Sequence, residues 1–291
     1  MIPLPQQDLD PLTPADHRQV VRLFQRAPRS HIHYDWRTLE EWLPHPDFCA
    51  YIARRRGVVE SMIGATVHQA PIPDSPTVAW LRFILPATSF GHDPALDALW
   101  DRLQADLQAR QVRQVALLAI DEWTGQLAQR WGYDLVNAVI TLRRTHGLTP
   151  PIEPPYAVRE VRSAEDLQQV AAIDAAAFKP PWVYNYDTIL VAQRQATTLT
   201  VIENEDRMLG YQLSTSHSRD GHLARLAVLP DFQGRGLGGM LIGEMVRFFE
   251  GRGVTTLTVN TQEDNLASQH LYRRLGFYYT GHRVPVWSIN L

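Results

Sequence analysis

Four glycines between residues 234 and 239 are well suited to binding a phosphate group. They lie in the stretch PDFQGRGLGG, which follows the apolar run LARLAVL and precedes the helical pattern MLIGEMVRFFE. Glycine has no Cβ, so backbone N–H groups at the start of that helix can approach an anion closely. The stretch therefore predicts a site for a phosphorylated cofactor.

Two common phosphate-binding loops fit this stretch poorly. Gly234, Gly236 and Gly239 satisfy GxGxxG, but other residues separate the first glycine from the strand, and the next strand ends at Asn260 instead of an acidic residue. No Gly-Lys-Ser/Thr follows the glycines, which excludes a nucleoside-triphosphate loop of the Walker type. A dinucleotide-binding loop is disfavoured.

A second motif lies 27 residues beyond Gly238 and reads N-x-x-S-x-x-L-Y-x-x-x-G-F, from Asn265 to Phe277. Together with Q-x-x-G-x-G, which begins at Gln233, it resembles the GNAT superfamily of acyl-CoA-dependent N-acyltransferases. The resemblance rests on motifs over residues 156–291. It implies that acetyl-CoA is the co-substrate and that an amine of a small molecule or a peptide attacks the thioester directly.

The resemblance also implies roles for individual residues. Loop amides would hold the pyrophosphate of acetyl-CoA, and a splayed strand would offer backbone groups to its pantetheine arm. The implied cofactor-binding residues are Leu226, Ala227, Val228, Gln233, Gly234, Arg235, Gly236, Leu237, Gly238, Gly239, Asn265, Ser268 and Tyr272.

Tyr272 is the implied catalytic residue, because in this family the tyrosine at its place protonates the leaving thiolate. A free tyrosine has a pKa near 10 and a thiol near 8.5, so full proton transfer costs roughly 2 kcal/mol. Tyr272 is therefore expected to donate a strong hydrogen bond or to act as a concerted acid. The alternative is a tyrosine that only packs between helix and sheet.

A general base is not evident. Ribosomal-protein alanine N-acetyltransferases, which this half resembles, carry a glutamate twelve residues before the tyrosine, where this chain has Asn260. Deprotonating a lysine amine at pH 7 costs ~4.6 kcal/mol, but an α-amine costs only ~1.4 kcal/mol. An acceptor of low pKa needs no dedicated base. Glu203, His217 and His222 are the other candidates, acting through water.

The acceptor site and any metal site are less marked. Trp182 and Tyr184, in KPPWVYNYD, are expected either to form a wall of the acceptor site or to form a lid packed on the other half of the chain. His31 and His33 alternate as strand-borne ligands would, but no third ligand is nearby in the sequence, so no metal is expected.

The chain contains two similar halves, joined by the proline-rich segment THGLTPPIEPPYA. Pro86, Leu127 and Gly132 recur 144 residues later. The first half, residues 8–144, resembles the family by architecture only, since SFGHDPA stands in place of QGRGLGG and Ala128 in place of the tyrosine. We expect an α/β (α+β) protein with two tandem GNAT-type domains, each a mixed, mostly antiparallel sheet flanked by helices.

The expected boundaries are a degenerate GNAT-like domain at residues 1–146, a proline-rich linker at 147–157, and an acetyl-CoA-binding catalytic domain at 158–291. A mycothiol-synthase-like acetyltransferase is one alternative function. A non-catalytic coenzyme-A-binding sensor or scaffold, which would not need Tyr272, is the other.

Composition limits the partners and the location. The chain has 291 residues, one cysteine (Cys49) and a formal net charge of -3, so no nucleic-acid partner is expected. Neither a membrane-spanning apolar run nor a signal peptide is evident, so no membrane partner is expected and a bacterial-type cytoplasmic protein is predicted. The protein is expected to be a monomer or a homodimer.

Overall fold

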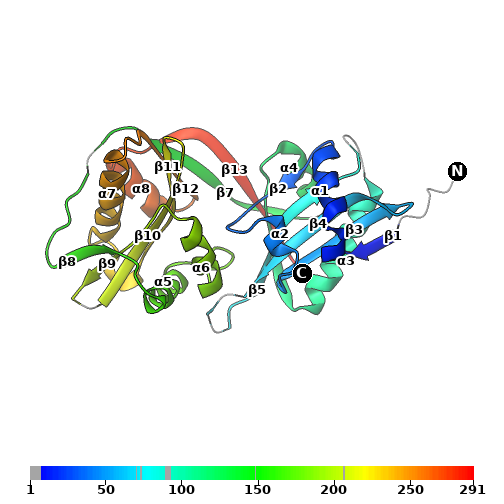
Figure 1. The fold of residues 1–291 in the computed structure, drawn as a ribbon, viewed down its shortest axis with the longest axis horizontal. Coiled ribbons are helices and arrows are strands. Elements are labelled where there is room, and N and C mark those ends of the chain that lie inside the picture. The colour runs from blue at the N-terminus through cyan, green and yellow to red at the C-terminus, as the bar shows by residue number, and fades with distance from the viewer. Residues whose placement is uncertain (1–7, 70, 73, 89–92, 148, 206) are drawn as a thin grey trace. The chain divides into compact units, whose positions relative to one another are not determined.

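The computed structural model describes residues 8–69, 71–72, 74–88, 93–147, 149–205 and 207–291. The chain divides into two compact units, whose elements are labelled in Figure 1. Unit 1 runs to Val136 and also includes Pro285–Leu291, whereas unit 2 is Asn137–Val284. Both units are mixed α/β with mostly antiparallel strands flanked by helices, which confirms the expected fold class.

Unit 1 contains a sheet in the order β1-β3-β4-β5-β6-β13, and β2 pairs with β5. Its elements are β1 (Asp8–Pro11), α1 (His17–Arg26), β2 (His31–Ile32), α2 (Leu39–Trp42), β3 (Phe48–Arg55), β4 (Val58–His68), β5 (Thr77–Leu85), α3 (Pro94–Ala109), β6 (Val112–Leu118) and α4 (Glu122–Arg130).

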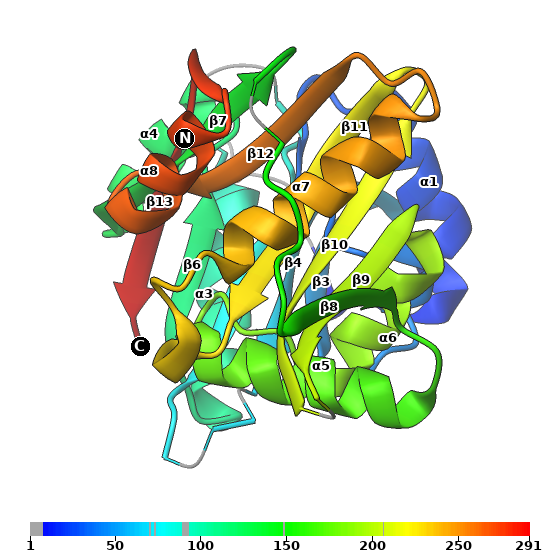
Figure 2. The ribbon, with the colours of Figure 1, turned by 90° about the vertical axis from the view of Figure 1, so that its left-hand side faces the viewer.

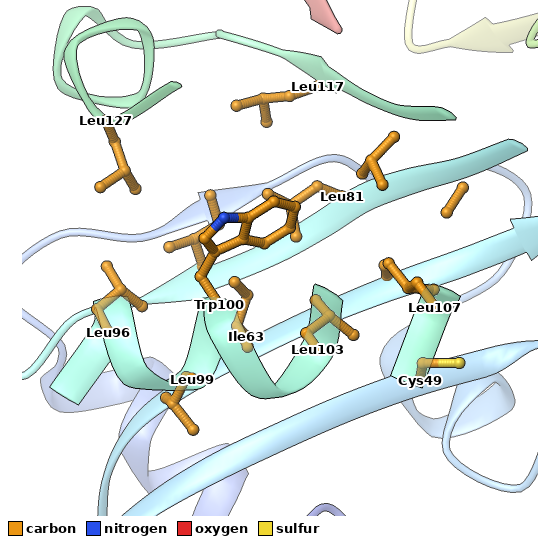
Figure 3. Close-up of a cluster of buried hydrophobic side chains, with 14 of the residues drawn as sticks. Cys49, Ile63, Leu81, Leu96, Leu99, Trp100, Leu103, Leu107, Leu117 and Leu127 are labelled. Atoms are coloured by element: carbon orange, nitrogen blue, oxygen red, sulfur yellow. The ribbon is translucent and has the colours of Figure 1, made fainter. Parts of the chain in front are cut away.

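The core of unit 1 forms where α3 packs on its sheet. Asp93 caps the helix by accepting hydrogen bonds from the backbone N–H groups of Ala95 and Leu96. Leucines and Trp100 then recur at helical spacing, and Figure 3 shows them facing the strands that carry Ile63 and Leu81. This core joins α3 to the sheet of the first half.

Unit 2 contains a sheet in the order β13-β7-β12-β11-β10-β9-β8. Its elements are β7 (Asp134–Arg144), β8 (Tyr156–Glu160), α5 (Ala164–Ala177), α6 (Tyr186–Gln195), β9 (Thr198–Asn204), β10 (Arg207–His217), β11 (Asp220–Val228), α7 (Leu237–Glu250), β12 (Thr256–Gln262), α8 (Leu266–Arg274) and β13 (Tyr278–Asn290). The β11–β12 pair is parallel, and the pairs on either side of it are antiparallel.

The sheet of unit 2 is covered on both faces. Successive strand residues point to opposite faces, and the neighbours Arg225 and Leu226 show where each face leads. Arg225 pairs with Asp174 of α5, whereas Leu226 packs with Leu237 and Leu241 of α7. Figure 2 shows α7 lying across the strands β10 and β11.

The two halves exchange their last strands. β7 closes the first half in sequence, yet residues 139–144 pair with β12 of unit 2. β13 closes the second half, yet residues 286–290 pair with β6 of unit 1. Residues 137–146, expected in the first domain, and 285–291, expected in the second, therefore cluster with the opposite unit. Alternation of apolar side chains does not specify which sheet receives a strand.

The proline-rich segment after β7 packs against unit 2. Arg144 Nη2 donates to the carbonyl of Gly147 at 3.0 Å, and Arg247 Nη1 on α7 donates to the carbonyl of Pro150 at 2.8 Å. At Gly243 an added Cβ would lie 2.6 Å from that same Pro150 oxygen, so the glycine allows the close approach. Within the described residues, no helix is long and apolar enough to cross a membrane.

Candidate active site

The site begins where β11 and β12 separate. Their parallel pairing runs from Asp220 opposite Thr256 to Leu223 opposite Val259 and stops there. β11 continues along β10 to Val228, and β12 continues along β7 to Gln262. Figure 2 shows the two strands diverging. The backbone of Ala224–Val228 consequently has an open edge on the side that faces β12.

The glycine loop lies between the open edge and the start of α7. Gly234 has φ +76° and Gly236 has φ +86°, and a Cβ added at either position would meet no atom within 4 Å. The first helical hydrogen bond runs from Met240 N to Gly236 O. The N–H groups of the first helical turn have no partner in the helix, and they adjoin open space.

A groove of about 480 Å³ connects this loop to the splayed strand and to α8, and such a volume is typical of a small-molecule site. Of the thirteen predicted cofactor-binding residues, all but Arg235 and Tyr272 line it. Those that do are Leu226, Ala227, Val228, Gln233, Gly234, Gly236, Leu237, Gly238, Gly239, Asn265 and Ser268.

Several of these side chains have structural roles within the protein. Leu237 is 1% exposed in the core under α7, so only its backbone N–H is available to a ligand. Gln233 Nε2 donates to the carbonyl of Val228 at 3.0 Å, which ties the loop to the end of β11. Asn265 Oδ1 accepts from Ser268 N at 3.1 Å and caps α8. Arg235 donates to the backbone carbonyl of Asp231.

Tyr272 lines a second, smaller cavity that adjoins the first, since both are lined by Phe178, Leu226, Asn265 and Ser268. The tyrosine side chain is 5% exposed. Burial raises its pKa, against an opposing effect of the positive charge of Arg225. The phenol therefore stays protonated at neutral pH and is available as a donor.

Trp182 and Tyr184 line the same cavity. They belong to the segment between α5 and α6, and Arg225 fixes this segment in place. The Arg225 guanidinium lies over the rings of Phe178 and Tyr184, with its carbon 3.6 Å and 3.9 Å from the ring centroids. Its Nη2 also donates to the carbonyl of Trp182.

Asp174 anchors this arrangement from α5, where its side chain is completely buried. Its carboxylate accepts from Arg225 Nε at 2.7 Å and Nη2 at 2.8 Å, from the Tyr211 hydroxyl at 2.5 Å and from Tyr184 N at 2.6 Å. Burial alone would lower the pKa of Arg225, but the carboxylate of Asp174 raises it above its ordinary value. The side chain of Asp174 is completely enclosed, and that of Arg225 is 9% exposed.

Sequence reasoning missed Arg225 and Asp174, although both left a signal. Asp174 interrupts the apolar run AAIDAAAF on the inward face of a helix, and Arg225 stands in the apolar strand LARLAV. Buried charges at inward positions need partners of opposite sign. Two such residues in one half predict an ion pair. Because they are far apart in the sequence, the sequence alone does not show that they come into contact.

None of the three base candidates from the sequence lines the cavity at Tyr272. Glu203 accepts from Arg159 at 2.8 Å, in an ion pair. His222 hydrogen-bonds with Thr258, and burial lowers its pKa. Asn260 does line the cavity, and its Oδ1 accepts from Thr141 of the exchanged strand β7 at 2.9 Å. Thr141 is a further residue that the sequence did not indicate.

In unit 1 the parallel strands β5 and β6 also diverge, but a strand of the same unit, β2, occupies the gap between them. The parallel pairing of β5 with β6 ends at Trp80 opposite Ala116. Beyond that point β2 pairs with β5, with His31 opposite Ile84. The edge that stays open in unit 2 is thus covered in unit 1. Burial lowers the pKa of His31 to about 4, and among the described residues no three His, Cys, Asp or Glu side chains are grouped to hold a metal.

The sequence of the chain matches one protein-family model and several known acetyltransferases. Residues 163–277 match the Acetyltransferase (GNAT) family. The chain is 32% identical over 117 residues to the [ribosomal protein bS18]-alanine N-acetyltransferase of Salmonella typhimurium, covering 40% of this chain and 78% of that protein. It is 28% identical over 171 residues to the mycothiol acetyltransferase of Rhodococcus opacus, covering 52% of this chain and only 56% of that protein.

Solved structures resemble the chain over almost its full length. A tandem GNAT protein from the clavulanic acid biosynthesis pathway superposes with a TM-score of 0.67, covering 98% of both chains at 14% identity. A GCN5-related N-acetyltransferase from Sphaerobacter thermophilus superposes with a TM-score of 0.59, covering 98% of this chain and 95% of that one at 16% identity. At these identities the likeness shows the fold, including its tandem arrangement.

Proposed function

Because the chain belongs to the GNAT family of acetyltransferases, we propose that unit 2 transfers an acetyl group from acetyl-CoA to an amine of low pKa, such as the α-amine of a small molecule or a peptide. The observation that carries the choice of amine is the lining of the cavity at Tyr272. Among the described residues it contains aromatic, amide and hydroxyl side chains, one arginine and no Asp, Glu or His.

The glycine loop fits the pyrophosphate of acetyl-CoA. Gly234 and Gly236 leave free the volume that side chains would occupy, and the unpartnered N–H groups of the first turn of α7 favour an anion. The open edge of β11 offers backbone groups to an extended amide-bearing chain. Bound acetyl-CoA would supply a thioester carbonyl that an amine can attack.

Tyr272 is suited to the leaving group. Its phenol is held protonated by burial, and the residue lines the smaller cavity, which adjoins the groove of the glycine loop. A donor placed at the sulfur stabilises the thiolate as it forms, and such assistance contributes typically 10²- to 10⁴-fold to a rate. The residue thus acts on the leaving thiolate and not on the attacking amine.

The amine must arrive neutral, because the described cavity residues provide no proton acceptor of ordinary basicity. Freeing an α-amine at pH 7 costs ~1.4 kcal/mol, whereas freeing a lysine side chain costs ~4.6 kcal/mol. The difference corresponds to a factor of several hundred in the reactive fraction.

A set of amines with graded pKa values tests the proposal, with release of free coenzyme A thiol as the measurement. We expect α-amines to be acetylated and lysine side-chain amines and polyamines to be poor acceptors at pH 7. Efficient acetylation of lysine side chains would contradict the low-pKa acceptor. Acetyl-CoA binding without acetylation of any amine would favour the sensor or scaffold.

A cytoplasmic location is part of the proposal. The chain's single cysteine is buried and free, which supports a protein that does not depend on disulfides. Fractionation of producing cells, followed by detection of the protein, tests this location.

A further inference from the structure

One nitrogen of Arg225 has hydrogen-bonding capacity that the protein does not use. Nε and Nη2 donate to Asp174 and to the carbonyl of Trp182. Nη1 carries two further N–H groups, and no described residue accepts from them. Nη1 is not fully enclosed by the protein, and Arg225 lines the cavity at Tyr272, so we take Nη1 as the atom that a ligand in this cavity would meet.

The guanidinium is held rigidly, so this unused donor has a fixed position. Arg225 is 9% exposed, and the rings of Phe178 and Tyr184 lie within 4 Å of its central carbon. The fork of two bonds to Asp174 sets the plane of the group. A donor fixed in this way loses little conformational entropy when it binds a ligand.

The charge balance indicates which acceptor atom suits this donor. The positive charge of Arg225 is already matched by the carboxylate of Asp174, which is completely buried. A ligand carboxylate would add a second negative charge to a poorly solvated pair, whereas a neutral carbonyl would add none. The oxygen that fits Nη1 best is therefore an uncharged carbonyl.

We propose that Arg225 Nη1 binds the carbonyl oxygen next to the acceptor amine, so that the acceptor is an α-amino amide, the chemistry found at a peptide N-terminus. This inference rests on the proposed acetyl transfer and specifies its acceptor. Arg225 then has two functions, since it holds the α5–α6 segment in place and recognises the atom that distinguishes an α-amino amide from a simple alkylamine.

Three small acceptors of similar size test the inference: glycinamide, glycine and 2,2-difluoroethylamine. The fluorines lower the basicity of the last amine without supplying a carbonyl. Initial rates of thiol release, divided by the concentration of unprotonated amine, give kcat/KM for each. We expect glycinamide to exceed difluoroethylamine by about 10- to 150-fold, the effect of one hydrogen bond to a charged group, and to exceed glycine as well.

Arg225→Lys removes the forked donor but keeps a cation for Asp174. It should lower the ratio of glycinamide to difluoroethylamine towards one, with acetyl-CoA affinity unchanged by calorimetry. The matched control is Arg159→Lys, because Arg159 also forms a forked pair with an aspartate, Asp166, away from the cavity. The control should leave the ratio unchanged.

The outcomes separate this inference from the proposed function. If Arg225→Lys slows both amines equally, Arg225 has only a structural role and the inference is overturned. Equal kcat/KM for glycinamide and difluoroethylamine in the unmodified protein overturns it too, while leaving acetyl transfer intact. A preference for glycine would refute the neutral carbonyl, and acetylation of none of the amines would count against the proposed function itself.

Discussion

Leu223 of β11 and Val259 of β12 are the last two residues at which these strands pair. Beyond them β11 keeps its hydrogen bonds to β10, and β12 keeps its bonds to β7. The gap therefore lies in the middle of a sheet and not at its margin. It allows a ligand to contact both the α7 side, where the glycine loop lies, and the α5 side, where Arg225 and Asp174 lie.

Gly236→Glu should weaken acetyl-CoA binding at least 100-fold, because the new carboxylate would face the pyrophosphate. Gly253→Glu is the matched control, since Gly253 also has positive φ, +74° against +86°, and an added Cβ would meet nothing within 4 Å. The two variants share the backbone strain and the added charge. Titration calorimetry should show lost affinity only at residue 236, and unchanged affinity there would mean that the loop does not hold the phosphates.

Tyr272→Phe should lower kcat by about 10²- to 10⁴-fold and leave KM and acetyl-CoA affinity nearly unchanged. The ring packs beside Phe277, with centroids 5.7 Å apart, and phenylalanine preserves that contact. Steady-state kinetics together with calorimetry on the same sample separates a lost donor from a collapsed site. Full turnover by the variant would make Tyr272 a packing residue.

The pH profile should have a rising limb and no falling limb below pH 10. Activity should rise as the acceptor amine loses its proton, because the neutral amine is the nucleophile. Burial raises the pKa of Tyr272 above its ordinary value near 10, so the phenol remains protonated across this range. Measuring kcat from pH 6 to pH 10 tests this, and a decline between pH 8 and pH 9 would argue against Tyr272 as the donor.

Intact protein should bind one acetyl-CoA per chain. In unit 1, β2 already pairs with the part of β5 that extends past β6, so an extended ligand has no free strand edge there. Calorimetric stoichiometry gives the number directly. Two equivalent sites would show that β2 is displaced by the ligand.

Asp174→Asn should lower the free energy of unfolding by about 3–5 kcal/mol, because it leaves the buried guanidinium of Arg225 without a counter-charge. Glu263→Gln is a suitable control, since it breaks an ion pair with Arg283 whose side chains are 47% and 39% exposed. Exposed pairs contribute at most about 1 kcal/mol. Urea unfolding of both variants measures the difference, and equal losses would contradict the buried pair's importance.

The motifs in the second half allowed its main features to be predicted from sequence. The run LARLAVL, the glycine loop and the following helix appear in the expected order, and eleven of the thirteen predicted cofactor residues line one groove. Such elements can be predicted from neighbouring residues alone, because a glycine-rich turn and the helical spacing of apolar residues are both short-range features of a sequence. The same reasoning overlooked that N-x-x-S is also the spacing of a helix cap, which Asn265 forms with Ser268.

The remaining features depend on contacts between distant residues. Asp174 and Arg225 are brought together only by the register of α5 against the sheet. β2 has two residues, too few to show any alternation, so its pairing with β5 leaves no pattern in the sequence. Thr141 reaches Asn260 only because β7 joins the sheet of the second half.

The strand exchange has a consequence for biosynthesis. The chain emerges from the ribosome with its N-terminal half first, but residues 286–290, which complete that half's sheet beside β6, are made only after the strands β7 to β12. Until then the edge of β6 carries unpaired N–H and C=O groups and exposes an aggregation-prone surface. Likewise, β7 has no β12 to pair with until that strand is made, more than a hundred residues later. Neither half can finish folding as an independent piece, so a ribosome that stops early releases two incomplete sheets in place of one finished domain.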